Sequence, residues 1–189
     1  MPTHVEPTAI ADVKLITPAL VRDERGFFVE TYNRAALAGA GIAAEFVQDN
    51  LSFSRPRGTL RGLHFQLPPH AQGKLVRVAR GSIFDVALDI RTGAPTFGKH
   101  VGATLTAESG AQLWIPPGFA HAFCTLEDDT EVCYKVTDYY YPDLDRGIAF
   151  DDPELAIRWP FTPAAMTLSA RDRRHPRLRE LASPFVWAR

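Results

Sequence analysis

The sequence is poor in several features that define common protein classes. Only two of its 189 residues are cysteines, Cys124 and Cys133, so a disulfide framework is excluded and free thiols are expected. The 21 basic and 22 acidic residues nearly cancel, which excludes a bulk charge that attracts nucleic acid or an anionic membrane. No apolar run approaches about 20 residues, and the N-terminus lacks the basic and apolar regions of a signal peptide. We therefore expect a cytoplasmic protein without nucleic-acid or membrane partners, which binds any anion through a local site.

The sequence also lacks the glycine-rich nucleotide loop, the HExxH helix and the cysteine cluster that reveal many enzymes. It contains instead a series of short strand-like segments separated by glycine and proline, a pattern typical of a sandwich, barrel or jelly roll. These strands are expected at residues 46–50, 60–66, 73–80, 82–90, 100–106, 112–115, 120–126 and 131–137. We predict one mainly β domain over residues 1–189.

Only a few short helices are expected, towards the two ends of this domain. A hairpin with a polar tip at residues 22–26 precedes a short helix, for which Asn33 is the predicted N-cap and Gly39 the end. A last helix is predicted after Ser169, because Ser169 and Asp172 have the spacing of a capping pattern. Capping is therefore one explanation for Asp172.

Two predicted strands carry polar residues on faces expected to be buried. In segment 82–90, alternate residues are apolar, but the opposite face carries Asp85 and Asp89 and is too acidic for an ordinary core. In segment 131–137, Tyr134 shares a face with apolar neighbours. A buried phenol usually finds a hydrogen-bond partner, so a core tyrosine is the simplest explanation for that residue taken alone.

The segment LRGLHFQ at residues 60–66 places a guanidinium and an imidazole on one short strand. A histidine can hold or release a proton near neutral pH, although a lone histidine on an apolar strand is more often a hydrogen-bonded core residue. Strict alternation would put Arg61 and His64 on opposite faces. Either Gly62 marks a bulge that redirects the chain, or Arg61 reaches around a sheet edge.

The polar residues of these segments suit acid–base chemistry on an anionic substrate. The candidate proton handlers and charge stabilisers are His64, Lys74, His121, Tyr134 and Asp172, and the candidate anion binders are Arg25, Arg61 and Arg171. Metal ligation is the first alternative. The His-x-His pair of metal-binding jelly rolls is, however, replaced here by His64-Phe65-Gln66, and His70 follows two prolines. A site without metal is therefore preferred.

Without a metal, a cofactor or a clear covalent nucleophile, the remaining chemistry is removal and return of a proton at an acidified carbon. His64 would be the base, made more basic by a carboxylate partner. Lys74 would stabilise the negative oxygen that develops. A second donor on the other face, Tyr134, would turn simple exchange into inversion.

Nine short motifs, in this order, resemble one known family. They are DERGFF at 23–28, QDN at 48–50, LRGLHFQ at 60–66, AQGKLV at 71–76, PTFG at 95–98, WIP at 114–116, GFAH at 118–121, YK at 134–135 and SARD at 169–172. From about residue 13 to residue 178 the sequence resembles the dTDP-4-dehydrorhamnose 3,5-epimerases, sugar-nucleotide epimerases of the cupin superfamily. The resemblance implies a cupin-type jelly roll (double-stranded β-helix) that uses no cofactor and no metal.

The resemblance also implies a role for each matching residue. His64 would remove protons from carbons 3 and 5 of a 4-keto sugar, with Asp172 as its paired carboxylate. Lys74 would stabilise the enolate, and Tyr134 would return a proton from the opposite face. The implied substrate-binding residues are Arg25, Phe28, Glu30, Gln48, Asn50, Arg61, His121 and Arg171. The family forms homodimers that exchange N-terminal strands, so Arg25 is expected to serve the partner's site.

Three positions depart from the family pattern: Leu51 replaces a common His, Ala122 a Gly and Arg171 a Lys. They bear on substrate detail more than on reaction type. The family's acidic residue beyond Tyr134 aligns only loosely with Asp145. The expected reaction converts dTDP-4-dehydro-6-deoxy-D-glucose to dTDP-4-dehydro-L-rhamnose in deoxysugar biosynthesis. An epimerase of a secondary-metabolite pathway that inverts one carbon, and a non-catalytic sugar-nucleotide binder, remain open alternatives.

Overall fold

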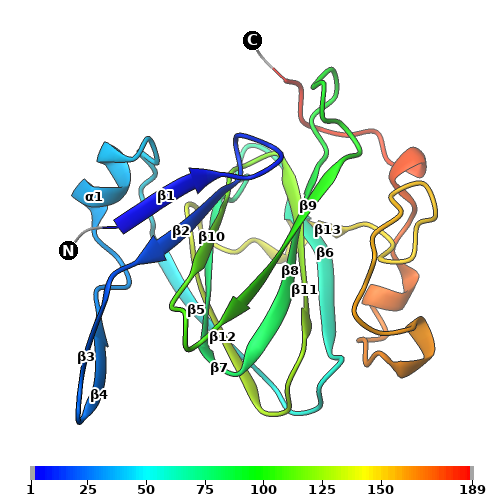
Figure 1. Cartoon of the computed structure of the whole chain (residues 1–189). Helices are drawn as coiled ribbons and strands as arrows, with labels where there is room; N and C mark the ends of the chain where they lie inside the picture. The colour runs from blue at the N-terminus through cyan, green and yellow to red at the C-terminus, as the bar shows by residue number, and fades with distance from the viewer. Residues whose placement is uncertain (1–2, 188–189) are drawn as a thin grey trace.

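The computed structural model describes residues 3–187, and two β-sheets form its centre (Figure 1). The strands are β1 (Thr3–Pro7), β2 (Lys14–Pro18), β3 (Leu20–Asp23), β4 (Gly26–Val29), β5 (Gln48–Ser54), β6 (Leu60–Gln66), β7 (Lys74–Arg80), β8 (Ser82–Asp89), β9 (His100–Thr106), β10 (Gln112–Ile115), β11 (Phe119–Thr125), β12 (Thr130–Val136) and β13 (Asp145–Gly147). The helix α1 (Arg34–Gly39) is joined by four 3-10 turns, η1 (Pro142–Leu144), η2 (Pro163–Ala165), η3 (Asp172–Arg174) and η4 (Leu178–Glu180). Within residues 3–187, no helix is long and apolar enough to cross a membrane.

The two sheets pack face to face. One has the strand order β1-β2-β10-β7-β12-β5 and the other the order β13-β6-β11-β8-β9. The main apolar cluster joins their inner faces, with Val76 and Val132 from the first sheet and Ile83 and Phe123 from the second. Burial of such apolar faces is the main source of stability, so this cluster holds the sheets together. The arrangement confirms the prediction of a mainly β jelly roll.

The outer face of the second sheet is covered as well. Leu63 and Leu88 belong to an apolar cluster that includes Leu178 of the C-terminal segment, which runs along this sheet in Figure 1. Strand β8 is therefore buried on both sides. Its two carboxylates, Asp85 and Asp89, are completely buried and each accepts a short hydrogen bond from an imidazole or guanidinium group. The acidic face is a polar network inside the protein.

The predicted N-terminal hairpin and helix are confirmed. Strands β3 and β4 pair as a two-stranded hairpin. The side chain of Asn33 accepts a hydrogen bond from the backbone N–H of Ala36 at 3.1 Å, so Asn33 caps α1 as expected. Leu37 is the buried residue that anchors this helix. Strand β5 starts two residues later than predicted and continues to Ser54.

The helix predicted after Ser169 forms as the two short 3-10 helices η3 and η4 and not as a continuous α-helix. Its first turn begins as expected: the Ser169 hydroxyl accepts a hydrogen bond from the backbone N–H of Asp172 at 3.0 Å. His175 then adopts an extended backbone, with ψ of 145°, directly before Pro176. A residue that precedes proline avoids the helical backbone conformation, so the helix ends after a single turn.

An irregularity in β6 decides how Arg61 and His64 are oriented. On β11, His121 pairs with His64 and Phe123 pairs with Arg61, so β6 advances three residues while β11 advances two. The extra residue reverses the alternation of β6, and both Arg61 and His64 face the same cavity. Gly62 allows this with a φ of +128°, where a Cβ would lie 2.5 Å from the carbonyl oxygen of His121. Of the two alternatives, the bulge is confirmed.

Candidate active site

A cavity of about 620 Å³ lies between the two sheets and the C-terminal segment. Its wall is formed by Gln48, Asn50, Leu51, Ser52, Phe53, Arg61, His64, Phe65, Gln66, Gln72, Lys74, His121, Phe123, Tyr134, Val136, Tyr140, Asp145, Ser169, Arg171 and Asp172. Nine of the twelve residues predicted for the site are in this wall. They come from strands far apart in the sequence, so the fold itself brings them together.

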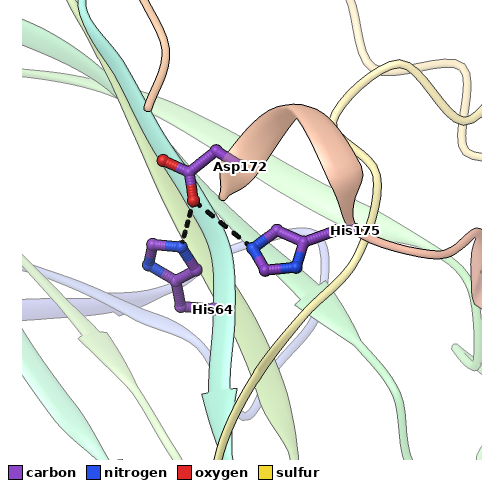
Figure 2. A group of neighbouring side chains, drawn as sticks. All are labelled: His64, Asp172 and His175. Atoms are coloured by element: carbon purple, nitrogen blue, oxygen red, sulfur yellow. Dashed lines mark hydrogen bonds and ion pairs between the residues drawn. The ribbon is translucent and has the colours of Figure 1, made fainter. Parts of the chain in front are cut away.

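His64 and Asp172 form a close pair on one side of this cavity (Figure 2). His64 Nε2 lies 2.6 Å from Asp172 Oδ1. An ionised carboxylate only accepts hydrogen bonds, so the proton of the neutral ring is on Nε2, and Nδ1 is the nitrogen that can act as a base. Burial opposes ionisation of Asp172, but contacts with His175 and His64 hold the pKa of its carboxyl well below the usual range. The carboxylate therefore stays charged beside the imidazole and orients it.

Lys74 supplies a positive charge from β7, in the opposite sheet. Burial lowers the pKa of Lys74 to about 8, although the carboxylates of Asp145 and Asp85 oppose this effect. The ammonium group is therefore still mostly protonated at neutral pH. A fixed cation in a largely desolvated cavity can stabilise a negative oxygen as it develops.

Tyr134 enters the cavity from β12, which is also in the sheet opposite His64. Burial raises the pKa of the Tyr134 phenol; Arg61 opposes the rise and Asp145 adds to it. The phenol therefore keeps its proton at neutral pH and can donate it. Because β6 and β12 belong to facing sheets, His64 and Tyr134 reach the cavity from two sides.

A second His–Asp pair lies directly beside the first. His121 on β11 is the register partner of His64, and its Nε2 is 2.6 Å from Asp85 Oδ1 on β8. Burial lowers the pKa of His121, while Asp85 opposes that shift. The other carboxylate oxygen of Asp85 is buried and makes no hydrogen bond with any described residue. Its charge acts on Lys74, so the buried pair supports the cation of the cavity.

Polar groups around the cavity form short hydrogen bonds with one another. Gln48 donates to the side-chain oxygen of Asn50 at 2.7 Å. Arg171 Nη1 donates to Asp145 Oδ2 at 2.6 Å, and the Tyr140 hydroxyl donates to the same oxygen at 3.1 Å. Amide and guanidinium groups in such an arrangement suit a ligand with phosphate oxygens and hydroxyl groups.

Three predicted binding residues lie outside the cavity of this chain. Arg25 and Phe28 belong to the β3–β4 hairpin, which projects away from the two sheets in Figure 1. The Arg25 side chain is 85% exposed and pairs with Asp23, while Phe28 is 63% exposed. Glu30 follows the hairpin and accepts a hydrogen bond from Asn33 at 3.1 Å. A single chain therefore does not bring these residues to its own cavity.

Some residues near the cavity were not predicted as site residues. Asp85 had a signal in the sequence, namely the acidic face of segment 82–90, but the signal did not identify its partner. Tyr140 lies in a loop, and His175 in the irregular C-terminal segment, where no periodicity indicates which residues will meet. Both positions depend on the tertiary fold.

Gln66 occupies the position where a metal-binding jelly roll would have its second histidine. Its Oε1 accepts a hydrogen bond from the backbone N–H of Tyr141 at 2.8 Å, and its Nε2 donates to the carbonyl of Tyr139 at 2.9 Å. A further hydrogen bond joins Nε2 to the carbonyl of His70. Gln66 thus anchors the loop at the cavity, and its polar groups are committed to backbone partners.

His64, Asp172 and His175 offer three atoms that could ligate a metal, all within 4.8 Å of one another. Two ligands bonded to one ion at about 2.1 Å lie roughly 3 Å or more apart. The 2.6 Å contact between His64 and Asp172 is shorter and corresponds to a direct hydrogen bond. The geometry fits an acid–base pair better than a shared ion, and the absence of a metal in the reaction stays a prediction.

The fold and cavity together define a class of protein: a cupin-type jelly roll whose cavity carries a His–Asp pair, a buried lysine and a tyrosine. The chain matches the dTDP-4-dehydrorhamnose 3,5-epimerase family over residues 7–180. A dTDP-4-dehydrorhamnose 3,5-epimerase of Sinorhizobium fredii is 48% identical over 190 residues, which cover 98% of this chain and 95% of that protein. The chain belongs to the dTDP-4-dehydrorhamnose 3,5-epimerase family and is thus an isomerase.

Solved structures agree with this assignment. The crystal structure of dTDP-6-deoxy-D-glucose-3,5-epimerase from Legionella pneumophila, in complex with dTDP-4-keto-L-rhamnose, superposes with a TM-score of 0.94 and 43% identity. The match covers 99% of this chain and 100% of that one. A more distant relative, the dTDP-4-dehydrorhamnose 3-epimerase of Streptomyces niveus, is 39% identical over 171 residues, or 89% of this chain and 81% of that protein.

Proposed function

We propose that the protein inverts carbons 3 and 5 of dTDP-4-dehydro-6-deoxy-D-glucose and releases dTDP-4-dehydro-L-rhamnose, as a step of deoxysugar biosynthesis. The observation that carries the proposal is the placement of His64 and Tyr134 on facing sheets of one cavity, with the Lys74 cation in the same wall. Removal of a proton on one side and its return on the other is inversion. The product bound in the Legionella pneumophila structure supports the substrate class.

Each inversion would begin at His64 and end at Tyr134. His64 Nδ1 takes the proton from a carbon next to the keto group, and Asp172 stabilises the imidazolium that forms. The electron pair of the broken C–H bond moves to the keto oxygen, whose negative charge Lys74 stabilises. Tyr134 then protonates the same carbon from the opposite side. Proton exchange with water restores both residues, so the cycle needs no redox step.

The same groups can serve both carbons. Carbons 3 and 5 both flank the keto carbon, so the negative charge develops on the same oxygen in each half of the reaction. One lysine in a fixed position can therefore stabilise both enolates in turn. Inversion at both carbons therefore requires only one site, which is consistent with a double epimerase.

The polar wall would bind the nucleotide part. Arg61 faces the cavity because of the β6 bulge, and Arg171 lies at the same cavity. Guanidinium groups bind phosphate oxygens through paired hydrogen bonds, so we assign the diphosphate to these two arginines. His121, Gln48 and Asn50 offer the neutral donors and acceptors that sugar hydroxyls require.

The exposed hairpin supports a further part of the proposal. We assign the chain to a homodimer of single-domain subunits in which each β3–β4 hairpin reaches the partner's cavity, so that Arg25, Phe28 and Glu30 bind substrate there. The exposed apolar surface of Phe28 and its neighbour Phe27 supports this assignment, because isolated hairpins rarely keep such surface in water.

Mixing two inactive variants tests the exchange. In a mixed dimer of Arg25→Ala and His64→Ala subunits, one cavity combines an intact His64 with an intact Arg25 from the other subunit. Activity should therefore return when the two purified variants are unfolded together and refolded. Each variant refolded alone is the control. Mixed samples as inactive as the controls, although light scattering shows dimers, would place Arg25 in its own subunit's site.

The reaction itself is tested by turnover in deuterated water. Incubation of dTDP-4-dehydro-6-deoxy-D-glucose with the protein should place deuterium at carbons 3 and 5, as read by NMR of the product. Deuterium at one carbon alone would favour the single-carbon alternative, because the Streptomyces niveus relative is named as a 3-epimerase. Deuterium at neither carbon, with dTDP binding retained, would overturn the proposal in favour of a non-catalytic binder.

A further inference from the structure

His175 contacts the catalytic pair although it is not part of the cavity wall. Its Nε2 lies 3.3 Å from Asp172 Oδ1, the same oxygen that contacts His64 Nε2 at 2.6 Å. Figure 2 shows the two imidazoles approaching this oxygen from different sides. The rings of His64 and His175 meet edge to face, with centroids 5.6 Å apart. One carboxylate oxygen is thus shared between two imidazole groups.

The position of His175 is fixed by the strand next to His64. The His175 ring packs on Gly147 of β13, where any Cβ would collide with the ring. Gly147 is itself the register partner of His64. The backbone is held as well, since the carbonyl of Pro176 accepts a hydrogen bond from the backbone N–H of Ala149 at 2.8 Å. The His175 imidazole is therefore largely buried and packed in a fixed position beside His64.

Asp172 needs such support because of where it lies. His64 is on β6, which pairs with a strand on each side, whereas Asp172 is on the three-residue turn η3 of an irregular segment. Its backbone N–H donates to the Ser169 hydroxyl, but this bond does not fix the carboxylate. His175 Nε2 approaches the carboxylate at 3.3 Å, a charge contact that is not aligned as a direct hydrogen bond, and it contributes to the lowered pKa of Asp172. His175 thus orients the Asp172 carboxylate, and the Asp172 carboxylate orients His64.

We propose that His175 is a positioning residue: it holds the Asp172 carboxylate, and through it aims His64, without touching the substrate. The inference rests on the proposed role of His64 as the base. This role belongs to a residue outside the cavity wall. It also explains why a glycine stands opposite His64 in β13, since no other residue leaves room for the ring.

Two variants separate positioning from packing. His175→Phe keeps a ring in the same place but has no N–H, whereas the amide nitrogen of His175→Gln can donate from about the position of Nε2. For His175→Phe we expect kcat to fall about tenfold or more with KM within about twofold, because a misplaced catalytic group can cost up to about a hundredfold. His175→Gln should recover most of the loss. Thermal unfolding of both variants monitors folding.

The pH profile provides a readout that packing alone would not change. Without the His175 contact, the charge of Asp172 acts on His64 alone, which favours the protonated imidazole in the variant. The acidic limb of kcat/KM should therefore move to higher pH in His175→Phe. His175→Gln should return the limb towards its original position. An unshifted limb with equal losses in both variants would overturn the proposal.

An NMR measurement keeps this inference distinct from the reaction. The imidazole N–H signal of the His64–Asp172 hydrogen bond should shift in His175→Phe and be restored in His175→Gln, with no substrate present. If the wild-type protein placed no deuterium in the sugar but this signal responded as expected, the proposed function would fail and the positioning contact would stand. An unchanged signal in both variants would refute the positioning role.

Discussion

Two His–Asp pairs lie side by side in this molecule and have the same contact distance. In each pair, the histidine Nε2 is 2.6 Å from the aspartate Oδ1. The histidines His64 and His121 are direct register partners on β6 and β11. The pairs differ in where the carboxylate comes from and in how much water or substrate reaches the ring. Pair geometry alone therefore does not define a catalytic base.

The difference lies in access. His64 keeps 29% of its side chain exposed, towards the cavity, and its carboxylate comes from the C-terminal segment. His121 keeps 8%, and its partner Asp85 is completely buried in the neighbouring strand. Burial lowers the pKa of His121, so this ring stays neutral and acts as a fixed donor. The first pair can exchange a proton with a substrate, and the second supports the site.

The largest effect should follow removal of the accessible imidazole. His64→Asn should lower kcat by about a thousandfold or more, because a general base contributes roughly 10² to 10⁴ in rate. Binding of dTDP, measured by calorimetry, should stay within a few-fold. His4→Asn is a matched control, since His4 is 72% exposed on β1 and should leave turnover unchanged. Turnover retained in His64→Asn would remove His64 from the chemistry.

Neutralising the carboxylate of the same pair should have the next largest effect. Asp172→Asn should lower kcat by about a hundredfold or more, because an amide can neither stabilise the imidazolium nor fix its tautomer. The folded protein holds the pKa of Asp172 below its unfolded value, so this carboxylate contributes stability above about pH 4 that is lost on acidification. The variant should therefore show a weaker loss of stability between about pH 5 and pH 2 in urea unfolding. An unchanged acid dependence would contradict this assignment.

Breaking the buried pair should affect stability more than chemistry. His121→Phe leaves the Asp85 carboxylate buried without its hydrogen-bond donor, and loss of one partner of a buried pair typically costs about 3–5 kcal/mol. We expect a loss of this size in the free energy of unfolding, measured with urea, and a fall in kcat of only about tenfold. If activity fell as far as in His64→Asn while stability was kept, the distinction between the two pairs would fail.

The same two pairs show what sequence patterns can and cannot predict. The strands were predictable because alternation and turn residues are local signals, and nine of the residues predicted for the site do line one cavity. The orientation of Arg61 was not decided, because it depends on a bulge against β11. The acidic face of segment 82–90 indicated that Asp85 is unusual, but it did not identify His121 as the partner of Asp85. Such contacts depend on register between distant strands.

The C-terminal segment shows a second kind of limit. A capping pattern at Ser169 predicted a helix, but Pro176 ends the turn early and places His175 in an extended conformation. The hairpin that carries Arg25 shows a third limit: it projects away from the two sheets, and no pattern within one chain indicates which cavity it serves. Periodicity in the sequence predicts strands and helices, whereas the contacts that their side chains make depend on residues from other parts of the chain.

The smallest expected effect concerns how the buried pair tunes the cation of the cavity. The pKa of Lys74 is lowered to about 8, so Lys74 loses its charge, and the enolate its stabilisation, as the pH rises through that value. The basic limb of kcat/KM, which reports groups of the free enzyme, should therefore have a midpoint near pH 8. Asp85 opposes the lowering, and Asp85→Asn keeps an acceptor for His121 but removes the charge. The midpoint should then move to lower pH, with a loss of about two- to threefold at pH 8 and little change at pH 6.5.

Lys74→Arg is the control that identifies the titrating group, because a guanidinium stays charged over this range and the limb should disappear. A midpoint that is the same in Asp85→Asn as in the wild type would show that the buried pair supports the fold without acting on the cation, and the two pairs would then be independent.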